Sequence, residues 1–391
     1  AALVALALVP VGAGAAEDDS LAAREATLDA AAAWRDVLDA YRAPLWPRPA
    51  QSRVVTLMLR QAPLVGAPGN GASIDAEQAA VSSVIADLGG QVVGRTRVVA
   101  NTLTVHVPTG AVEAIGRIPE VRAVVPVSFL APAQAAGSSP DAVASAAAGR
   151  GGARVPAGRA AGARAVHIAL IDTGVDVSHP WLGGGIGPTF PIIGGFDHVD
   201  RDRDPRIDAR AAQTEAHGTE MAGLVLHSSA FAGLEPTRRP RLIVHRVAAE
   251  EAIGGRVRLL ARSDRVLEAL ESAVDPNGDG DPADRAEVIL LGLANAFAGD
   301  GSDPLVEALA GAERAGSLVV VPAGNDGPTN GRNGSLGALA SSAHVLTVGG
   351  VSGPVTARTV DLRAQMGAAV ATLAGLPLLG ATPVDDALPV G

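Results

Sequence analysis

An aspartate and a histidine in this sequence stand in settings that suit acid–base catalysis. Asp172 follows the apolar run Val166–Ile171, and His217 opens a run of small and apolar residues, Gly218–Leu226. A carboxylate that holds one ring nitrogen of a histidine leaves the other nitrogen to act as a general base. The two residues therefore predict a base and the group that orients it. A lone histidine near a helix start is more often structural, so the pair needs support from its surroundings.

A nucleotide-binding site is an alternative for Asp172, because an aspartate at the end of a strand can hold a ribose hydroxyl. The phosphate-binding turn of that fold is a Gly-x-Gly-x-x-Gly segment between a strand and a helix. The glycine cluster Gly183–Gly187 is followed by Pro188 and lies in an expected loop. A nucleotide-binding α/β protein therefore stays open as a weaker interpretation.

The elements that would position these residues alternate between strands and helices. Apolar runs and amphipathic spacing predict, in order, strand Val166–Ile171, helix Gly218–Leu226, strand Leu242–Val247, helix Ser263–Val274, strand Val288–Leu293, helix Pro304–Ala315, strand Leu318–Pro322 and strand Val345–Val351. Such alternation predicts an α/β fold with a doubly wound, mostly parallel sheet. Ligands of such sheets bind beyond the carboxyl ends of the strands, where Asp172 stands.

A smaller unit precedes this domain. Residues 53–131 show strands and helices in the order βαββαβ, namely Val54–Leu59, Asp75–Leu88, Gln91–Val99, Thr102–Val107, Thr109–Ile118 and Val121–Val127. That order predicts a small α+β domain with an antiparallel sheet. Residues 132–163 are rich in Ala, Gly, Ser and Pro and predict a flexible linker, whereas residues 17–52 predict a helical segment that ends in a Pro-rich stretch.

Composition excludes several classes of function. The 391 residues carry 41 acidic and 31 basic side chains, a formal net charge of −10, which argues against a nucleic-acid partner. Cysteine is absent, which excludes thiol catalysis, disulfides and thiolate metal sites. Residues 1–16 form an apolar run with a small-residue cleavage pattern, which predicts a truncated signal peptide and a secreted protein, extracellular or in the cell envelope. No other apolar run is long enough to span a membrane, so we expect no membrane span in the mature chain.

Five segments, in order, resemble motifs of the subtilase family of subtilisin-like serine proteases. They are Asp172–Val175 with His179-Pro180, the acidic stretch Gly195–Pro205, His217–Thr219 with Ala222-Gly223, Ala323–Asn325 with Gly327-Pro328, and Leu346–Gly350. The resemblance covers residues 164–352 and implies the N-terminal part of a subtilisin-like catalytic domain. The unit at 53–131 resembles the propeptide that chaperones and inhibits these enzymes in cis.

This resemblance implies roles for particular residues. Asp172 would fix the tautomer of His217, His217 would be the general base, and the amide of Asn325 would donate to the oxyanion. The strand that binds substrate would be formed by Gly292, Leu293 and Ala294. The expected partners are protein or peptide substrates and the chain's own propeptide. No cofactor is required, and self-cleavage is expected in or after Phe129–Gly137.

The nucleophilic serine of the family is not recognisable. The best match to its Gly-Thr-Ser-x-Ala motif is Gly367–Ala371, with Ala369 at the nucleophile position, and this match follows Asn325 too closely to leave room for the intervening elements. We therefore expect a fragment of a longer enzyme whose serine lies beyond Gly391. Residues 353–391 would then begin an inserted domain or continue the catalytic domain. The alternative is an inactive pseudoenzyme that binds peptides or proteins.

Two acidic features complete the candidate site. Glu220 stands close to His217 in the sequence and would raise the pKa of that histidine if its own side chain were buried. A calcium loop is suggested by the oxygen ligands at Asp275, Asn277, Asp279 and Asp281. However, the twelfth position of that loop is Ala286, which is not an acid. A Ca²⁺ site and a solvated acidic turn therefore both stay open.

Overall fold

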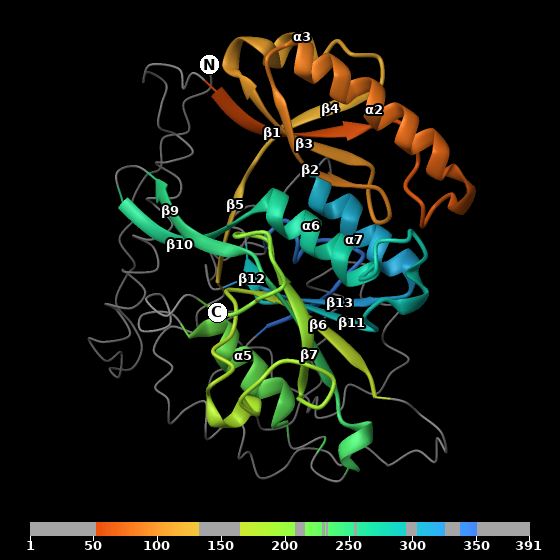
Figure 1. Cartoon of the computed structure of the whole chain (residues 1–391). Coiled ribbons are helices and arrows are strands. Elements are labelled where there is room, and N and C mark those ends of the chain that lie inside the picture. The colour runs from red at the N-terminus through yellow and green to blue at the C-terminus, as the bar shows by residue number, and fades with distance from the viewer. Residues whose placement is uncertain are drawn as a thin grey trace, which may run out of the picture.

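A computed structural model describes residues 52–132, 165–207, 216–228, 231, 234–253, 256–294, 303–324 and 337–349. These residues form an N-terminal module, residues 52–132, and a larger domain built on a parallel sheet (Figure 1). The expected signal peptide, nearly all of the Pro-rich segment and of the linker, and residues 353–391 lie outside the described residues. None of the described helices is long and apolar enough to cross a membrane.

The N-terminal module has the predicted βαββαβ order. Its elements are β1 (Ser52–Leu59), α2 (Gly71–Asp87), β2 (Gln91–Thr96), β3 (Thr102–Pro108), α3 (Val112–Ile115) and β4 (Val121–Pro126). The strands pair antiparallel in the order β2-β3-β1-β4. Helix α2 begins at Gly71, ahead of the predicted start at Asp75, because its first turn carries the fully buried Ile74 into the core.

The two faces of this four-stranded sheet differ in chemistry. Successive residues of a strand point to opposite faces, and Leu57, Leu103 and Val105 lie on the face that packs with the module's own helices in one aliphatic core. The other face carries Thr56 and Thr104, which are opposite one another in the β1–β3 pairing and are both buried. The module therefore buries one face within itself and the other against the larger domain.

The larger domain has the predicted doubly wound sheet. Six strands pair in parallel in the order β14-β13-β11-β6-β8-β7, with bounds Leu346–Val348, Leu318–Pro322, Val288–Leu291, His167–Asp172, Arg241–Arg246 and Ile192–Asp197. Strand β7 was not predicted, because Gly194 and Gly195 interrupt its apolar pattern. Short 3₁₀ turns occur at Pro68–Asn70, Thr109–Ala111, Pro180–Leu182, Pro236–Arg238 and Pro282–Asp284.

Helices cover both faces of the parallel sheet. On one face, Ile168 and Leu170 of β6 pack with Ala222 of α5 (His217–Leu226). On the other face, Ala169 and Ile171 of β6 pack with α6 (Ser263–Val274) and α7 (Pro304–Ala315). Because both faces are buried, the middle of β6, Ile168–Ile171, is continuously apolar rather than alternating, as expected for a central parallel strand.

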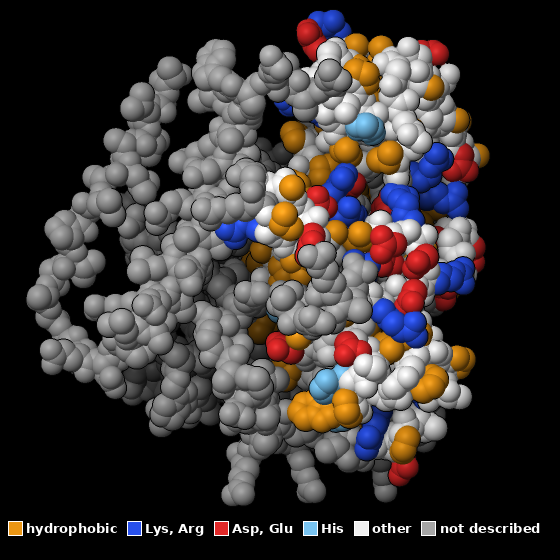
Figure 2. All heavy atoms as spheres, turned by 60° about the vertical axis from the view of Figure 1, so that its left-hand side comes forward, with side chains coloured by type: hydrophobic (Ala, Val, Ile, Leu, Met, Phe, Trp, Pro, Cys, Tyr) orange, Lys and Arg blue, Asp and Glu red, His pale blue; other side chains and the backbone are white. Residues whose placement is uncertain are grey.

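Helices α6 and α7 lie between the parallel sheet and the module (Figure 1). The module contributes Val98, Val99 and Ala100 from its β2–β3 turn to the core that also contains both helices. Acidic and basic side chains gather across the middle of the face drawn in Figure 2, and the ion pair between Arg122 and Glu307 joins the module to α7. The contact thus combines a small apolar centre with charged surroundings.

A second, antiparallel sheet connects the two parts of the chain. Its order is β12-β5-β10-β9, with bounds Leu293–Ala294, Phe129–Pro132, Arg256–Arg262 and Ala248–Ile253. Strand β5 is the end of the module, and it lies between two strands of the larger domain with Leu130 fully buried. This sheet was not predicted. Strands β5 and β12 are short and pair with distant parts of the chain, whereas β9 and β10 pair with each other as neighbours in the sequence.

Candidate active site

Asp172 stands at the carboxyl end of β6, the strand between β11 and β8. Its backbone is fixed on both sides, because Val247 donates to the Asp172 carbonyl at 3.0 Å and Gly292 donates to the Ile171 carbonyl at 3.1 Å. The side chain is completely buried and accepts a hydrogen bond from the backbone of Thr173 at 2.7 Å. A buried carboxylate held in this way is aimed at one partner.

That partner is His217, the first residue of α5. Its Nδ1 lies 2.8 Å from Asp172 Oδ1 and 3.1 Å from Oδ2. An ionised carboxylate can accept hydrogen bonds but cannot donate them. Nδ1 therefore carries the proton, and Nε2 is the basic nitrogen. The residue is 8% exposed, so a substrate could reach its edge while most of the ring is packed. The structure thus brings together the base and the orienting group that the sequence predicted.

The turn after β6 and the start of α5 are locked together at close range. A Cβ at Gly218 would stand 2.2 Å from the Gly174 carbonyl oxygen, so only glycine fits there. Gly174 itself has φ +94°, a conformation that favours glycine. The hydroxyl of Thr173 accepts from the Gly218 amide at 3.0 Å, and that of Thr219 accepts from the Asp176 amide at 2.9 Å. These contacts explain why small and hydroxyl residues surround the pair in the sequence.

Gly292 forms the third side of the site. A Cβ at this position would lie 1.9 Å from Asp172 Oδ2 and 3.2 Å from His217 Cε1. Any side chain here would therefore displace the carboxylate or the ring. Gly292 separates two strands, since β11 ends at Leu291 and Leu293 and Ala294 form β12.

The sequence model of the subtilase family matches residues 163–372, which include the whole of this site. The chain belongs to the subtilase family. Its α/β architecture, with a mostly parallel sheet and helices on both faces, is the subtilisin-like fold that the sequence predicted.

Curated relatives of this subtilase include proteases of Bacillus subtilis (strain 168). It is 29% identical over 214 residues to the minor extracellular protease Vpr, a match that covers 53% of this chain and 23% of that protein. It is 32% identical over 203 residues to the serine protease AprX, 51% of this chain and 41% of that one. The chain therefore spans less than half of either relative. A solved structure, the epidermin leader peptide processing serine protease (EpiP) of Staphylococcus aureus, aligns with 14% identity and a TM-score of 0.47, over 83% of this chain and 80% of that chain.

In this subtilase, strand β5 lies between β10 and β12, close to the Asp172–His217 pair. Leu130 of β5 is paired with Ala261 of β10, and on the other side Ala131 is paired with Ala294 of β12. Because β12 follows Gly292 directly and runs antiparallel to β5, the last residue of β5, Pro132, lies opposite Leu293, next to Gly292 and the Asp172–His217 pair. The predicted substrate-binding strand is thus already paired with an extended segment of the subtilase itself.

The condition set for Glu220 is not met, and two other predicted site residues lie outside the described residues. Glu220 is exposed on the first turn of α5, so the burial that would let it raise the pKa of His217 is not met. An exposed carboxylate is solvated and screened by water, which weakens its effect on the ring. Asn325 and Ala369 lie outside the described residues, so their roles stay predictions.

The acidic loop after α6 is closed by its own backbone. Asp275 Oδ1 accepts from the amides of Gly278 at 3.0 Å and Asp279 at 3.1 Å, and Oδ2 accepts from Gly280 at 2.8 Å. Asp281 caps the following turn at Ala283. Backbone amides thus occupy three of the roughly four acceptor positions of this carboxylate, an arrangement that fits the acidic turn. Among the described residues, no group of His, Asp or Glu side chains is arranged to hold a metal ion.

Glu271 of α6 was not singled out by the sequence, yet it anchors the module. Its carboxylate accepts from the backbone amides of Arg97 at 2.7 Å, Val98 at 2.8 Å and Val99 at 2.9 Å. Burial raises the pKa of Glu271 to about 7, against the lowering effect of these hydrogen bonds. Nearby, a Cβ at Gly311 of α7 would stand 2.1 Å from the Val99 carbonyl oxygen. A glycine inside a helix, where it costs stability, is the signal that marks this close approach.

Proposed function

We propose that this chain carries the propeptide and the N-terminal part of the catalytic domain of a secreted serine endopeptidase. The observation that carries the proposal is the position of β5, because an extended segment of the module pairs with the strand that leads to the buried Asp172–His217 pair. Secretion is supported by the apolar residues 1–16 and by the relative that is named as extracellular.

The proposed reaction is acyl transfer through a serine supplied from outside the described residues. His217 Nε2 takes the proton of the serine hydroxyl as its oxygen attacks the substrate carbonyl, and then gives that proton to the leaving amine. Asp172 holds the ring in place and stabilises the imidazolium. The Asn325 amide donates to the oxyanion.

In this proposal the N-terminal module is a propeptide that inhibits its own catalytic domain in cis. Its last strand is held like a substrate, by backbone pairing on both edges, so extended protein or peptide segments are the substrates. β5 ends at Pro132, which is opposite Leu293 and therefore next to Gly292. Self-cleavage is therefore expected shortly after Pro132, within residues 133–137.

A peptide-binding pseudoenzyme is the second candidate. It is favoured by one observation, since the backbone pairing of β5 requires no nucleophile and the sequence places Ala369 where the family motif has serine. The two candidates make different demands on the gene downstream of Gly391. A Gly-Thr-Ser-x-Ala motif there supports the enzyme, and a stop codon there supports the pseudoenzyme.

The test is self-processing of the full-length gene product. Wild-type protein should be cut near residues 133–137, as measured by intact mass and N-terminal sequencing. His217→Ala should abolish the cut, and Asp172→Asn should slow it by about 10⁴-fold, because the wrong tautomer is then favoured. His227→Ala is the matched control, since the side chain of that exposed histidine contacts Trp181, through its carbonyl and its ring, and not the Asp172–His217 pair. Normal processing by His217→Ala would remove His217 as the base.

A further inference from the structure

A tight turn after β7 is built to hold one side chain in place. The backbones of Asp197 and Asp202 pair in both directions, at 2.8 and 3.2 Å. Asp197 Oδ1 also accepts from the amides of Val199 at 2.7 Å and Asp200 at 3.1 Å. The guanidinium of Arg246 bonds both Asp197 and Asp200, so these carboxylates neutralise a buried cation of β8. The turn is therefore rigid and its acids are already engaged.

Arg201 stands at the tip of this turn in a conformation that L side chains rarely adopt. Its φ is +61°, and it is the one residue other than glycine with positive φ in the described part of the chain. Such backbone strain persists where surrounding contacts fix it, and it is a reason to look for a function. Arg201 Nη2 donates to the carbonyl of Val93 in the module and lies 3.2 and 3.4 Å from the two oxygens of Glu268 in α6.

The module presents a matching irregularity. In the β2–β3 pairing, Val92 is opposite Val105 and Gly94 is opposite Thr104, so Val93 is the extra residue of a β-bulge. A bulged residue is released from the ladder, and its carbonyl can accept from elsewhere. A Cβ at Gly94 would stand 2.1 Å from Glu268 Oε1, so the glycine lets the carboxylate come close enough to orient Arg201.

Glu268 is held from both sides. Its side chain is 16% exposed, with Arg201 on the outside and the buried His198 ring behind it, Nδ1 lying 3.9 Å from Oε2. A carboxylate fixed between these groups restricts the guanidinium to one direction, toward Val93. The bulge, the glycine, the strained turn and the partly buried carboxylate are thus four separate features that meet at one contact.

We propose that Arg201 and Glu268 form a further docking site for the module, which recognises the carbonyl of a bulged strand edge and lengthens the time that the module stays bound after the chain is cut. The inference rests on the proposed function, in which the module is a propeptide. The site is separate from the strands that pair with β5, so it continues to hold the module once β5 is freed at its cut end. The Arg201–Glu268 site fits a strand edge in which a bulged residue is followed by glycine. It therefore favours the chain's own module over modules that lack this feature.

The experiment uses the full chain with a recognition sequence for an added protease placed within residues 133–164. After the cut, release of the module is followed by size-exclusion chromatography over time. Arg201→Asn should speed release about fivefold to tenfold, because a partly exposed charge-assisted hydrogen bond is lost while asparagine keeps the left-handed backbone. Arg203→Asn is the matched control in the same acidic stretch and should release the module at the wild-type rate.

A second variant tests the same contact from the other side. Gly94→Ala should also speed release, because its methyl group displaces Glu268, and Arg201→Asn combined with Gly94→Ala should be no faster than the faster single variant. Wild-type release by Arg201→Asn overturns the docking site and leaves the propeptide assignment standing. Release of the wild-type module as soon as the chain is cut overturns both, because a module that does not stay bound cannot inhibit its catalytic domain.

Discussion

The two faces of the module's sheet are made from the same strands and serve opposite needs. One face carries Leu57, Leu103 and Val105 and closes an aliphatic core with α2 and α3. The other face meets α6 and α7 and carries threonines whose hydroxyls face one another, Thr56 with Thr104 at 3.5 Å and Thr96 with Thr102 at 2.7 Å. Hydroxyls that hydrogen-bond each other do not require hydrogen-bond partners on the helices, and they can also be solvated by water. The first face therefore stabilises the fold of the module, and in the proposed function the second is the face along which the module separates.

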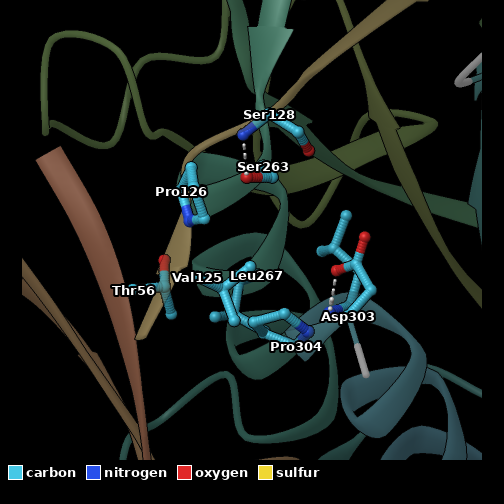
Figure 3. A pocket seen from close by; sticks show the side chains of 9 residues that line it. Thr56, Val125, Pro126, Ser128, Ser263, Leu267, Asp303 and Pro304 are labelled. Atoms are coloured by element: carbon cyan, nitrogen blue, oxygen red, sulfur yellow. Dashed lines mark hydrogen bonds between the residues drawn. The ribbon is translucent and has the colours of Figure 1, made fainter. Parts of the chain in front are cut away.

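The docking face is also incompletely packed. A cavity of about 200 Å³ lies between Thr56 and Val125 of the module and the first turns of α6 and α7 (Figure 3). The contact relies instead on backbone groups, with Glu271 bonded to three amides of the β2–β3 turn. Removing methyl groups from the folding core should therefore cost much stability. On the docking face, the largest effects should come from removing its few polar anchors.

The largest effect should come from the folding face. Leu57→Ala removes a fully buried side chain and leaves a cavity, so it should lower the free energy of unfolding of the module by about 3 kcal/mol. Thr56→Ala, the neighbour on the docking face, should cost less than about 1 kcal/mol. Urea denaturation of the full chain, followed by hydrogen exchange in β1 and β3, measures both. Equal losses would contradict the division between the faces.

Glu271→Gln should give the next largest effect, and it depends on pH. Burial raises the pKa of Glu271 from 4.5 to about 7, so between these values the unfolded chain loses this proton while the folded chain keeps it. The wild-type chain therefore loses stability as pH rises from 4.5 to 7, on the order of 2 kcal/mol, and the variant does not.

The measurement is the difference in Tm between wild type and Glu271→Gln at about pH 4.5, 6 and 8. The effects of the other titrating groups on Tm cancel in this difference. The difference should move in favour of the variant as pH rises and should be constant above about pH 7. A difference that moves toward the wild type instead would mean that the three amides keep the carboxylate ionised.

The smallest effect should come from Thr56→Val. This change makes the docking face more apolar, so separation exposes one more methyl group to water and release of the cut module should slow about threefold. Val55→Thr makes the reverse exchange on the folding face, and it should lower stability without slowing release. Faster release by Thr56→Val would show that the paired hydroxyls hold the module rather than ease its departure.

The sequence predicted those parts whose signal is local. Helix α6 has the predicted bounds because its apolar spacing is regular and Asp275 ends it, and the Asp172–His217 pair followed from a strand end and a helix start. Strand β5 was not predicted, because four residues pair only with partners far along the chain. The sequence also did not show why residue 292 must be glycine, since the group that leaves no room for a side chain there is the Asp172 carboxylate at the end of a different strand.

Strand β5 also has a consequence for how the protein behaves among its neighbours. It covers one edge of β10 and one edge of β12, and both edges become open rows of amides and carbonyls when it leaves. Open edges accept strands from any nearby chain and are common starting points for aggregation. In the proposed function, the module therefore protects the protein from self-association at these strand edges until it is released.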